Sequence, residues 1–145
     1  LTLRYLSYRP RSEKEIADYL KEKQKKAESL TSEMIEEILK KLREYKFIND
    51  SEFAKFWFEQ RSKFKRKPIR VVEYELNQKG INKQIIEEVL SGFDSKDLDL
   101  ENAKKLAVKK LDFYRNLDPK KRQEKVMNFL LRRGFNYDIV KKVFD

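Results

Sequence analysis

The sequence predicts an all-α protein built from three tandem three-helix repeats that form an elongated, curved helical array. An apolar pattern with the period of an α-helix occurs three times in the 145 residues. Its copies are 30–39, 81–90 and 135–144. The three prolines fall once before each copy, and no segment is convincing as a strand. A pattern that recurs in this way is typical of repeat proteins.

The repeated pattern is expected to be the last helix of each repeat. Its N-terminal position holds Thr31, Asn82 or Asn136, whose side-chain oxygens can accept hydrogen bonds from the first free amides of a helix. The apolar residues that follow share one helical face. The opposite face carries Glu36 and Glu37, Glu87 and Glu88, or Lys141 and Lys142. The core pattern is therefore kept, while the outer charge reverses in the third copy.

Each proline is expected to precede the middle helix of its repeat, because its missing N–H would be unpaired at a helix start. After the first proline, Ser12 and Glu15 have the spacing of a capping box. The second and third middle helices are expected to end at Gly80 and Gly134, since glycine readily adopts the left-handed conformation that terminates a helix. The tract 21–29 is expected to be a frayed helix end or a loop.

Each repeat also has an opening helix. Residues 50–54 parallel residues 99–103, and the first repeat retains only residues 1–8 for this helix. Since the chain starts on Leu1 rather than Met, we expect this first helix to be truncated. The predicted domains are 1–49, 50–98 and 99–145.

The composition excludes several kinds of chemistry. The sequence has no Cys and no His, so disulfides, thiolate nucleophiles, the usual zinc sites and Ser–His catalysis are excluded. The fragment Asp94-Ser95-Lys96 is similar to part of a nuclease site, but no strand holds it beside a second carboxylate. We therefore expect no enzymatic activity, no cofactor and no metal. No apolar stretch approaches the roughly 18 residues needed to span a bilayer, and we expect a cytoplasmic protein without a membrane partner.

The net charge of +10 points to a polyanion or an acidic protein surface as partner. The third repeat carries 13 basic and 7 acidic residues, a net charge of +6. Segment 61–70 has six basic residues and no acidic one, and segment 104–122 has eight basic residues against Asp112 and Asp118. Such Lys and Arg density is typical of phosphate-directed patches. The candidate contact residues are Arg61, Lys63, Lys65, Arg66, Lys67, Arg70, Lys109, Lys110, Lys120, Lys121, Arg122, Arg132 and Arg133.

Aromatic residues cluster between positions 53 and 64. At helical spacing Phe53, Phe56, Trp57 and Phe64 share one face, which indicates a core face and not a base-stacking surface. Phe58 points away from that face, so we expect it to pack between repeats or to face a partner.

Several stretches, taken in order, resemble the RecX family of bacterial regulators of the RecA recombinase. These are 9–20, 47–61, 73–86 and 128–135. One departure is Lys67-Pro68, where the family commonly has Gly-Pro. The resemblance, which covers nearly the whole chain, implies a protein that binds the RecA filament on single-stranded DNA and lodges in its helical groove. It also implies that this binding restrains the recombinase, ATPase and coprotease activities of RecA. We expect the chain to be a monomer.

Two other functions stay open on the residues alone. The chain could be a sequence-nonspecific DNA-binding repeat protein that acts without RecA. It could also be a helical scaffold for an acidic protein partner. The three functions differ in their dependence on salt and on RecA.

Overall fold

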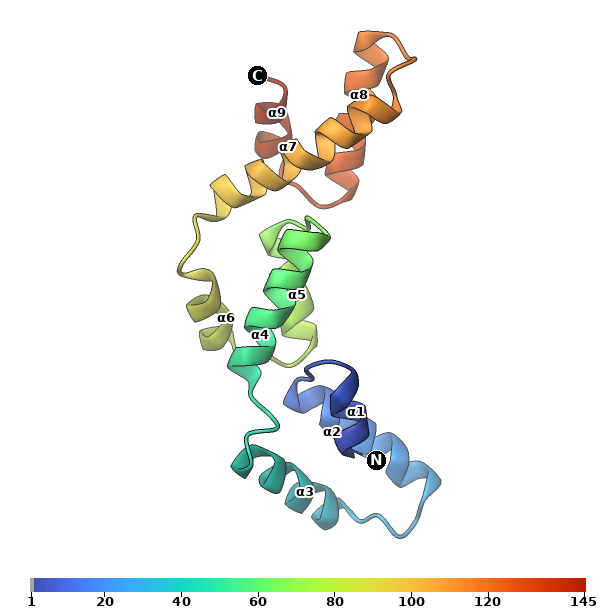
Figure 1. The fold of residues 1–145 in the computed structure, drawn as a ribbon, viewed down its shortest axis with the longest axis vertical. Helices are drawn as coiled ribbons and strands as arrows, with labels where there is room; N and C mark the ends of the chain where they lie inside the picture. Colours follow the sequence, from blue (N-terminus) through green and yellow to red (C-terminus); the bar gives the residue numbers. More distant parts are fainter. Residues whose placement is uncertain (1) are drawn as a thin grey trace. The chain divides into compact units, whose positions relative to one another are not determined.

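The computed structural model describes residues 2–145, and Leu1 lies outside the described residues. Within that range the structure contains nine α-helices, one π-helix and no strand (Figure 1). The elements are α1 (Thr2–Tyr8), α2 (Glu13–Lys26), α3 (Ser32–Glu44), α4 (Asp50–Glu59), η1 (Gln60–Phe64), α5 (Ile69–Gln78), α6 (Lys83–Leu90), α7 (Ser95–Phe113), α8 (Pro119–Arg132) and α9 (Tyr137–Val143). The prediction of an all-α tandem-repeat fold is confirmed.

The chain forms two compact units. Unit 1 contains Leu1–Trp57 and Glu75–Val89, and unit 2 contains Phe58–Tyr74 and Leu90–Asp145. In unit 1 the buried residues of one core are Ile16, Leu20, Ile35, Leu39, Leu42 and Ile48. In unit 2 they are Ala103, Ala107, Val126, Leu130, Phe135, Ile139 and Val140. The apolar faces of the first and third copies of the repeated pattern contribute to these cores, through Ile35, Leu39, Phe135, Ile139 and Val140. Met34 of the first copy is 46% exposed, and Ile86 of the second copy is buried.

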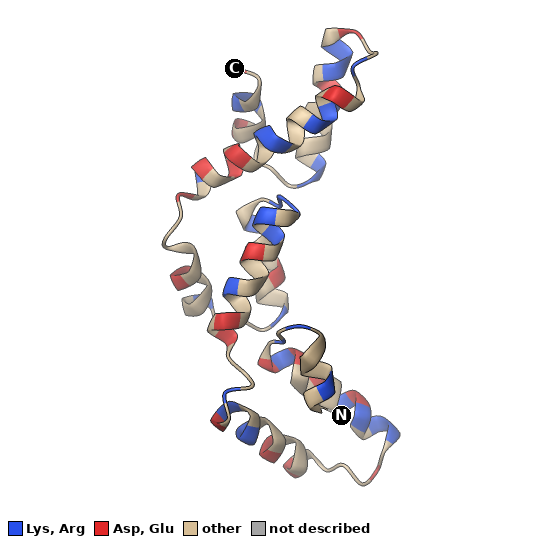
Figure 2. Ribbon diagram, in the orientation of Figure 1, with Lys and Arg blue, Asp and Glu red and all other residues tan. Residues whose placement is uncertain are grey.

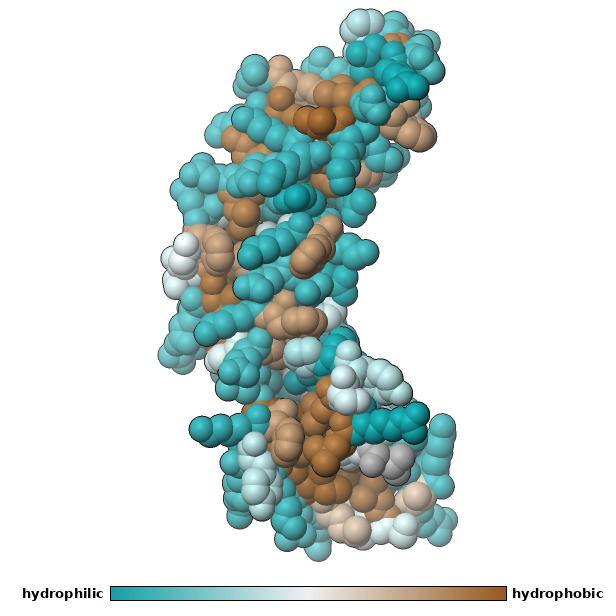
Figure 3. All heavy atoms as spheres, in the orientation of Figure 1, coloured by the Kyte–Doolittle hydropathy of each residue, from teal (hydrophilic) through white to brown (hydrophobic). Residues whose placement is uncertain are grey.

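The first repeat covers its core with a short opening helix. No residue of α1 is buried, although Tyr5 and Leu6 pack partly buried against the core. Apolar side chains are accordingly visible on the surface in the region of α1–α3 (Figure 3). The opening helices α4 and α7, with 10 and 19 residues, are longer than α1, which has 7.

The predicted helix starts are confirmed. Ser12 and Glu15 form both halves of a capping box at the start of α2. Thr31 accepts a hydrogen bond from the amide of Met34 at 3.1 Å. Asn82 and Asn136 each accept one at 2.8 Å at the starts of α6 and α9. The helix α2 continues to Lys26. The expectation of a frayed end or a loop over residues 21–29 was therefore wrong for residues 21–26. The Lys, Glu and Gln residues of this tract are good helix formers.

The opening helix of one repeat also caps the middle helix of the repeat before it. The carboxylate of Asp50 accepts a hydrogen bond from the amide of Glu13, the first residue of α2, at 3.0 Å. In the same way, Asp99 accepts one from the amide of Ile69, the first residue of α5, at 2.9 Å. Both bonds satisfy a free amide at a helix start and tie neighbouring repeats together.

Candidate polyanion-binding site

A depression of about 290 Å³ in unit 2 brings together cations from three segments of the chain. Its lining residues are Phe64, Lys65, Arg66, Leu106, Lys109, Lys110, Phe129 and Arg133. Five of these are cationic, three are apolar and none is acidic. The five cations all belong to the predicted contact set, and we call this surface the basic depression.

One edge of the basic depression is formed by η1 and the residues that follow it, where the backbone conformation is unusual. The chain leaves α4 through the π-helix η1, and the amide of Lys65 donates to the carbonyl of Gln60 at 3.4 Å. Arg66 follows in the left-handed region with a φ of 54°, which is uncommon for a residue other than glycine. Single π-helical turns and strained residues of this kind occur frequently at functional sites.

The π-helical turn overturns the prediction that Phe64 belongs to the core face. Phe53 and Trp57 are buried as predicted and Phe56 is partly buried, but the side chain of Phe64 is 72% exposed. A π-helical turn contains more residues than an α-helical turn. Phe64, at the end of η1, therefore does not lie on the helical face that α-helical spacing predicts for it. Phe58 is buried and lies against Phe93, with 4.9 Å between the ring centroids.

A buried polar chain positions Arg66 at the depression. The Nη1 atom of Arg66 donates to Oδ1 of Asn102 at 3.2 Å, and Nδ2 of Asn102 donates to the hydroxyl of Ser62 at 3.3 Å. Asn102 and Ser62 are each 2% exposed. Leaving buried polar groups of this kind unpaired would cost free energy of folding. The hydrogen bonds from Arg66 to Asn102 and from Asn102 to Ser62 therefore fix both the π-helical turn and the guanidinium group of Arg66.

Aromatic contacts hold two further cations along the depression. The Nζ atom of Lys110 lies 4.6 Å from the ring centroid of Phe129, and the guanidinium carbon of Arg133 lies 5.2 Å from the same centroid. Contacts of this type contribute about 0.5–1 kcal/mol each at exposed sites. They order the cations without neutralising them.

The cations of the basic depression keep their charge available. Across residues 2–145, none of the five forms an ion pair with a carboxylate. A cluster in unit 1 provides the contrast, since Arg9, Arg11 and Lys79 all surround the carboxylate of Glu15. Burial acts to raise the pKa of Glu15, but the hydrogen bonds and charges around it prevail and hold that pKa below its ordinary value of 4.5. The unit 1 cluster is therefore a neutralised network, whereas the basic depression can attract an anion.

The other predicted contact residues lie outside the depression. In η1, Lys63 is exposed and Arg61 is partly buried, and Lys67 in the link that follows is also partly buried. Arg70 is exposed on α5 close to Asp99, whose pKa is raised by burial although the Ile69 amide and the charge of Arg70 act to lower it. In Figure 2, α7 carries acidic residues in its first part and basic residues farther along.

The candidates of α8 have different roles. Lys120 and Lys121 are exposed near the start of α8, and Arg132 is exposed near its end. The guanidinium of Arg122 donates to the carbonyls of Arg115 and Leu117 at 3.1 and 3.0 Å, so it secures the connection between α7 and α8. The structure brings neither Arg122 nor Arg132 into the basic depression.

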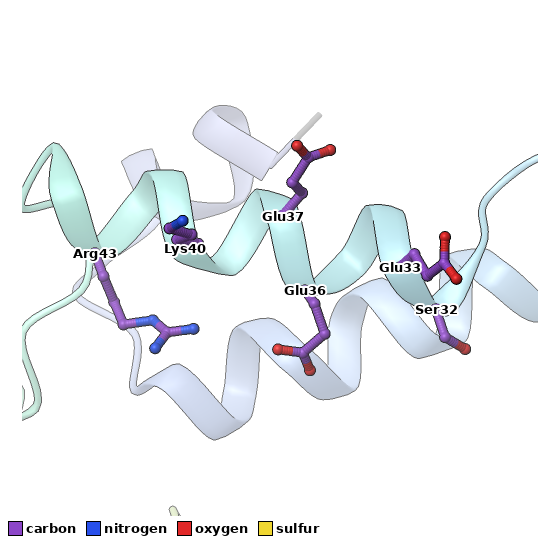
Figure 4. A pocket seen from close by; sticks show the side chains of 6 residues that line it. All are labelled: Ser32, Glu33, Glu36, Glu37, Lys40 and Arg43. Carbon is purple, nitrogen blue, oxygen red and sulfur yellow. The ribbon is translucent and has the colours of Figure 1, made fainter.

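A second depression, on the outer face of α3 in unit 1, does not favour an anion. It is lined by Ser32, Glu33, Glu36, Glu37, Lys40 and Arg43 (Figure 4). Figure 4 shows Glu36 and Arg43 pointing to one side of α3 and Glu37 to the other. Arg43 is engaged with Glu13, with 3.1 Å between Nε and Oε1. The remaining charge is mostly acidic.

Asp94 of the fragment with a nuclease-like sequence is a helix cap. Its carboxylate accepts hydrogen bonds from the amides of Lys96 and Asp97 at 3.0 and 3.3 Å, at the start of α7. In the part of the chain that the structure describes, no group of three or more acidic residues could hold a metal ion. None of the helices in that part is both long and apolar enough to cross a membrane.

Comparison with known proteins identifies the family. Three family models match in order along the chain: the first three-helix domain of RecX over residues 1–42, the second over 49–90 and the third over 97–144. The chain belongs to the RecX family. The resemblance found in the sequence is thereby confirmed, while the predicted boundaries at 49/50 and 98/99 stay a prediction.

Individual relatives agree with the RecX assignment. The "Regulatory protein RecX" of Listeria monocytogenes is 37% identical over 96% of this chain and 49% of that protein. The protein of the same name from Bacillus pumilus is 38% identical over 95% of this chain and 50% of that protein. The chain thus spans about half the length of the curated relatives it matches.

Solved RecX structures have a similar fold. A crystal structure of regulatory protein RecX is 34% identical with a TM-score of 0.76, over 99% of this chain and 68% of that one. The crystal structure of RecX from Lactobacillus salivarius is 30% identical with the same TM-score, over 99% of this chain and 89% of that one.

Proposed function

We propose that this RecX-family chain regulates the RecA recombinase by binding the RecA filament on single-stranded DNA. It mainly inhibits the recombinase, ATPase and coprotease activities of RecA, and it acts as a cytoplasmic monomer. Membership of the family supports a regulatory role, because the relatives are named as regulatory proteins. The resemblance described above supplies RecA as the target.

The basic depression is the observation that carries the proposed contact. Five cations from the segment after η1, from α7 and from the end of α8 line one surface without a carboxylate. A nucleoprotein filament presents a regular array of phosphates, and each cation that neutralises a phosphate adds affinity by releasing a counterion. The same charges steer the protein to the filament from a distance.

RecA-dependent ATP hydrolysis on single-stranded DNA tests the proposal. We expect the wild-type chain to suppress hydrolysis in a titration against a cognate RecA. The variant Lys109→Glu/Lys110→Glu should suppress hydrolysis equally only at a protein concentration at least about tenfold higher than that of the wild type. The reason is that two cations of the depression are replaced by anions, which phosphates repel.

The matched control is Lys141→Glu/Lys142→Glu. It makes the same charge change on the exposed outer face of α9, at the positions where the second repeat already has Glu87 and Glu88. This control should suppress hydrolysis nearly as well as the wild type. Equal loss in both double variants would show that only net charge matters, and unchanged hydrolysis with the wild type would refute regulation of RecA.

RecA-independent DNA binding is the second candidate, and the unpaired cations of the basic depression suit it as well. In that case naked DNA should be bound with a steep dependence on salt, and RecA hydrolysis should change only as far as DNA is sequestered. Excess DNA would then restore hydrolysis, whereas it should not restore hydrolysis if the filament itself is the target.

A further inference from the structure

We infer that Phe64 is a stacking platform for an unpaired base, and that it lets the basic depression distinguish single-stranded from double-stranded nucleic acid. The inference rests on the proposed function, because it names the feature of the nucleic acid that the same surface reads. It adds a specificity-determining residue to a contact that would otherwise recognise phosphates alone.

The exposure of Phe64 is built into the local backbone. Its side chain is 72% exposed at the lip of the depression, although a large apolar side chain is normally buried. The π-helical turn directs it outward, and the left-handed Arg66 and the buried pair Ser62–Asn102 fix the backbone on either side. An aromatic ring that is held in water by a strained and buried framework is pre-organised to bind a partner.

The neighbours of Phe64 suit a nucleotide. Lys65 and Arg66 follow it directly, and Lys109, Lys110 and Arg133 complete the cationic lining. Aromatic rings interleaved with cations in this way are typical of surfaces that bind single strands, where bases stack and phosphates pair with Lys or Arg. The base faces of a duplex are already stacked on one another, so a duplex can offer only its phosphates to this surface.

The other aromatic ring of the depression does not have this role. Phe129 is partly buried, and the cations of Lys110 and Arg133 lie over its ring. Its ring therefore serves to position cations. The 290 Å³ depression lies at the lower limit of typical small-ligand sites, which run from about 300 Å³ upward. This size suits a single nucleotide unit beside Phe64.

Direct binding to oligonucleotides tests the inference, with fluorescence anisotropy as the readout. The probes are an oligothymidylate, a base-free deoxyribose-phosphate oligomer with the same number of phosphates, and a duplex of the same length. The wild-type chain should bind the oligothymidylate about 5- to 150-fold more tightly than the base-free oligomer, the range expected for one stacked base.

The variant Phe64→Leu isolates the aromatic ring, because it keeps an apolar side chain at an exposed position. It should lose affinity for the oligothymidylate, and it should bind the base-free oligomer and the duplex as the wild type does. Phe47→Leu, at another exposed phenylalanine (52%), is the control and should keep the preference. Unchanged melting temperatures should show that both variants fold.

Two outcomes would overturn the inference. One is equal wild-type affinity for the oligothymidylate and the base-free oligomer. The other is an unaltered base preference in Phe64→Leu. Neither outcome refutes the proposed function, since suppression of RecA hydrolysis by the wild-type chain is measured separately and does not require a stacked base.

Discussion

Glu15 is held by several interactions in unit 1. Its carboxylate accepts hydrogen bonds from Arg9 and from the amide of Ser12, and Lys79 lies 3.5 Å away. Its side chain is 11% exposed, so solvent screens these contacts only weakly. The network ties the start of α2 to the end of α5, and the hydroxyl of Ser12 strengthens this link by donating to the carbonyl of Lys79 at 2.8 Å.

The lowered pKa of Glu15 predicts how stability depends on pH. A carboxylate whose pKa is lower in the folded state stabilises the fold above its ordinary value of 4.5, and this contribution is lost as the pH falls through the lowered folded value. Glu15→Gln should therefore lower the free energy of unfolding at pH 7 by about 1.5–3 kcal/mol, as expected for hydrogen bonds to a charged group. Urea unfolding at pH 7 and at pH 3 measures this. The difference in stability between the two proteins should be smaller at pH 3 than at pH 7, and an equal difference at both values would contradict the role of the charge.

Single residues also show where sequence reasoning falls short. Four of the five depression cations lie in the segments of high Lys and Arg density, and Arg133 was named separately at a helix end. Asn102 was missed as a positioning residue. A signal existed, because residues 99–103 parallel 50–54 and Asn102 occupies the position of the buried Phe53. A polar residue at a core position of one repeat indicates a buried partner.

The ends of the middle helices govern the contacts between neighbouring repeats. Gly80 and Gly134 adopt left-handed conformations with φ of 77° and 100°, as the helix-ending prediction required. Each also allows a close approach that the sequence did not reveal. A Cβ atom at Gly134 would lie 2.8 Å from a methyl group of Val71 on α5, and one at Gly80 would lie 2.7 Å from Cβ of Lys14 on α2.

Gly134→Ala should therefore destabilise unit 2. The left-handed conformation costs an L-residue about 1–2 kcal/mol, and the contact with Val71 adds to this cost. Thermal unfolding should show a clear fall in melting temperature. Gly92→Ala is the control, because an added methyl group there would have no atom within 4 Å and the φ of Gly92 lies outside the left-handed region. That variant should be neutral or more stable by up to about 1 kcal/mol, and similar effects for both would contradict the packing argument.

Helix ends and apolar faces were predicted well from the sequence where interactions between residues close in the chain determine them. The side-chain caps, the helix-ending glycines and the apolar faces depend on short-range hydrogen bonds and on helical periodicity, which the sequence displays. The π-helical turn of η1 lacks such a local signature. Its extra residue is stabilised by the bond between Ser62 and Asn102, 40 positions apart, so α-helical spacing misplaced Phe64.

At the scale of the whole molecule, the net charge is distributed unevenly along the chain, although the apolar pattern repeats. The net charge of +10 is divided unequally, with +6 in residues 99–145. The apolar faces of the first and third copies contribute to the two cores, while the outer face changes from acidic in the first two copies to basic in the third. The third repeat and the segment after η1 together supply the cations of the basic depression, which can attract a polyanion.

The most direct test of the central claim is the salt dependence of binding to RecA–single-stranded DNA filaments. We predict that Lys65→Ala, Lys109→Ala and Arg133→Ala, one from each segment of the depression, will each reduce the slope of log affinity against log salt concentration by about 1. Lys141→Ala should leave the slope unchanged. If the three variants keep the wild-type slope, or if Lys141→Ala reduces it equally, the basic depression is not the surface that binds the filament.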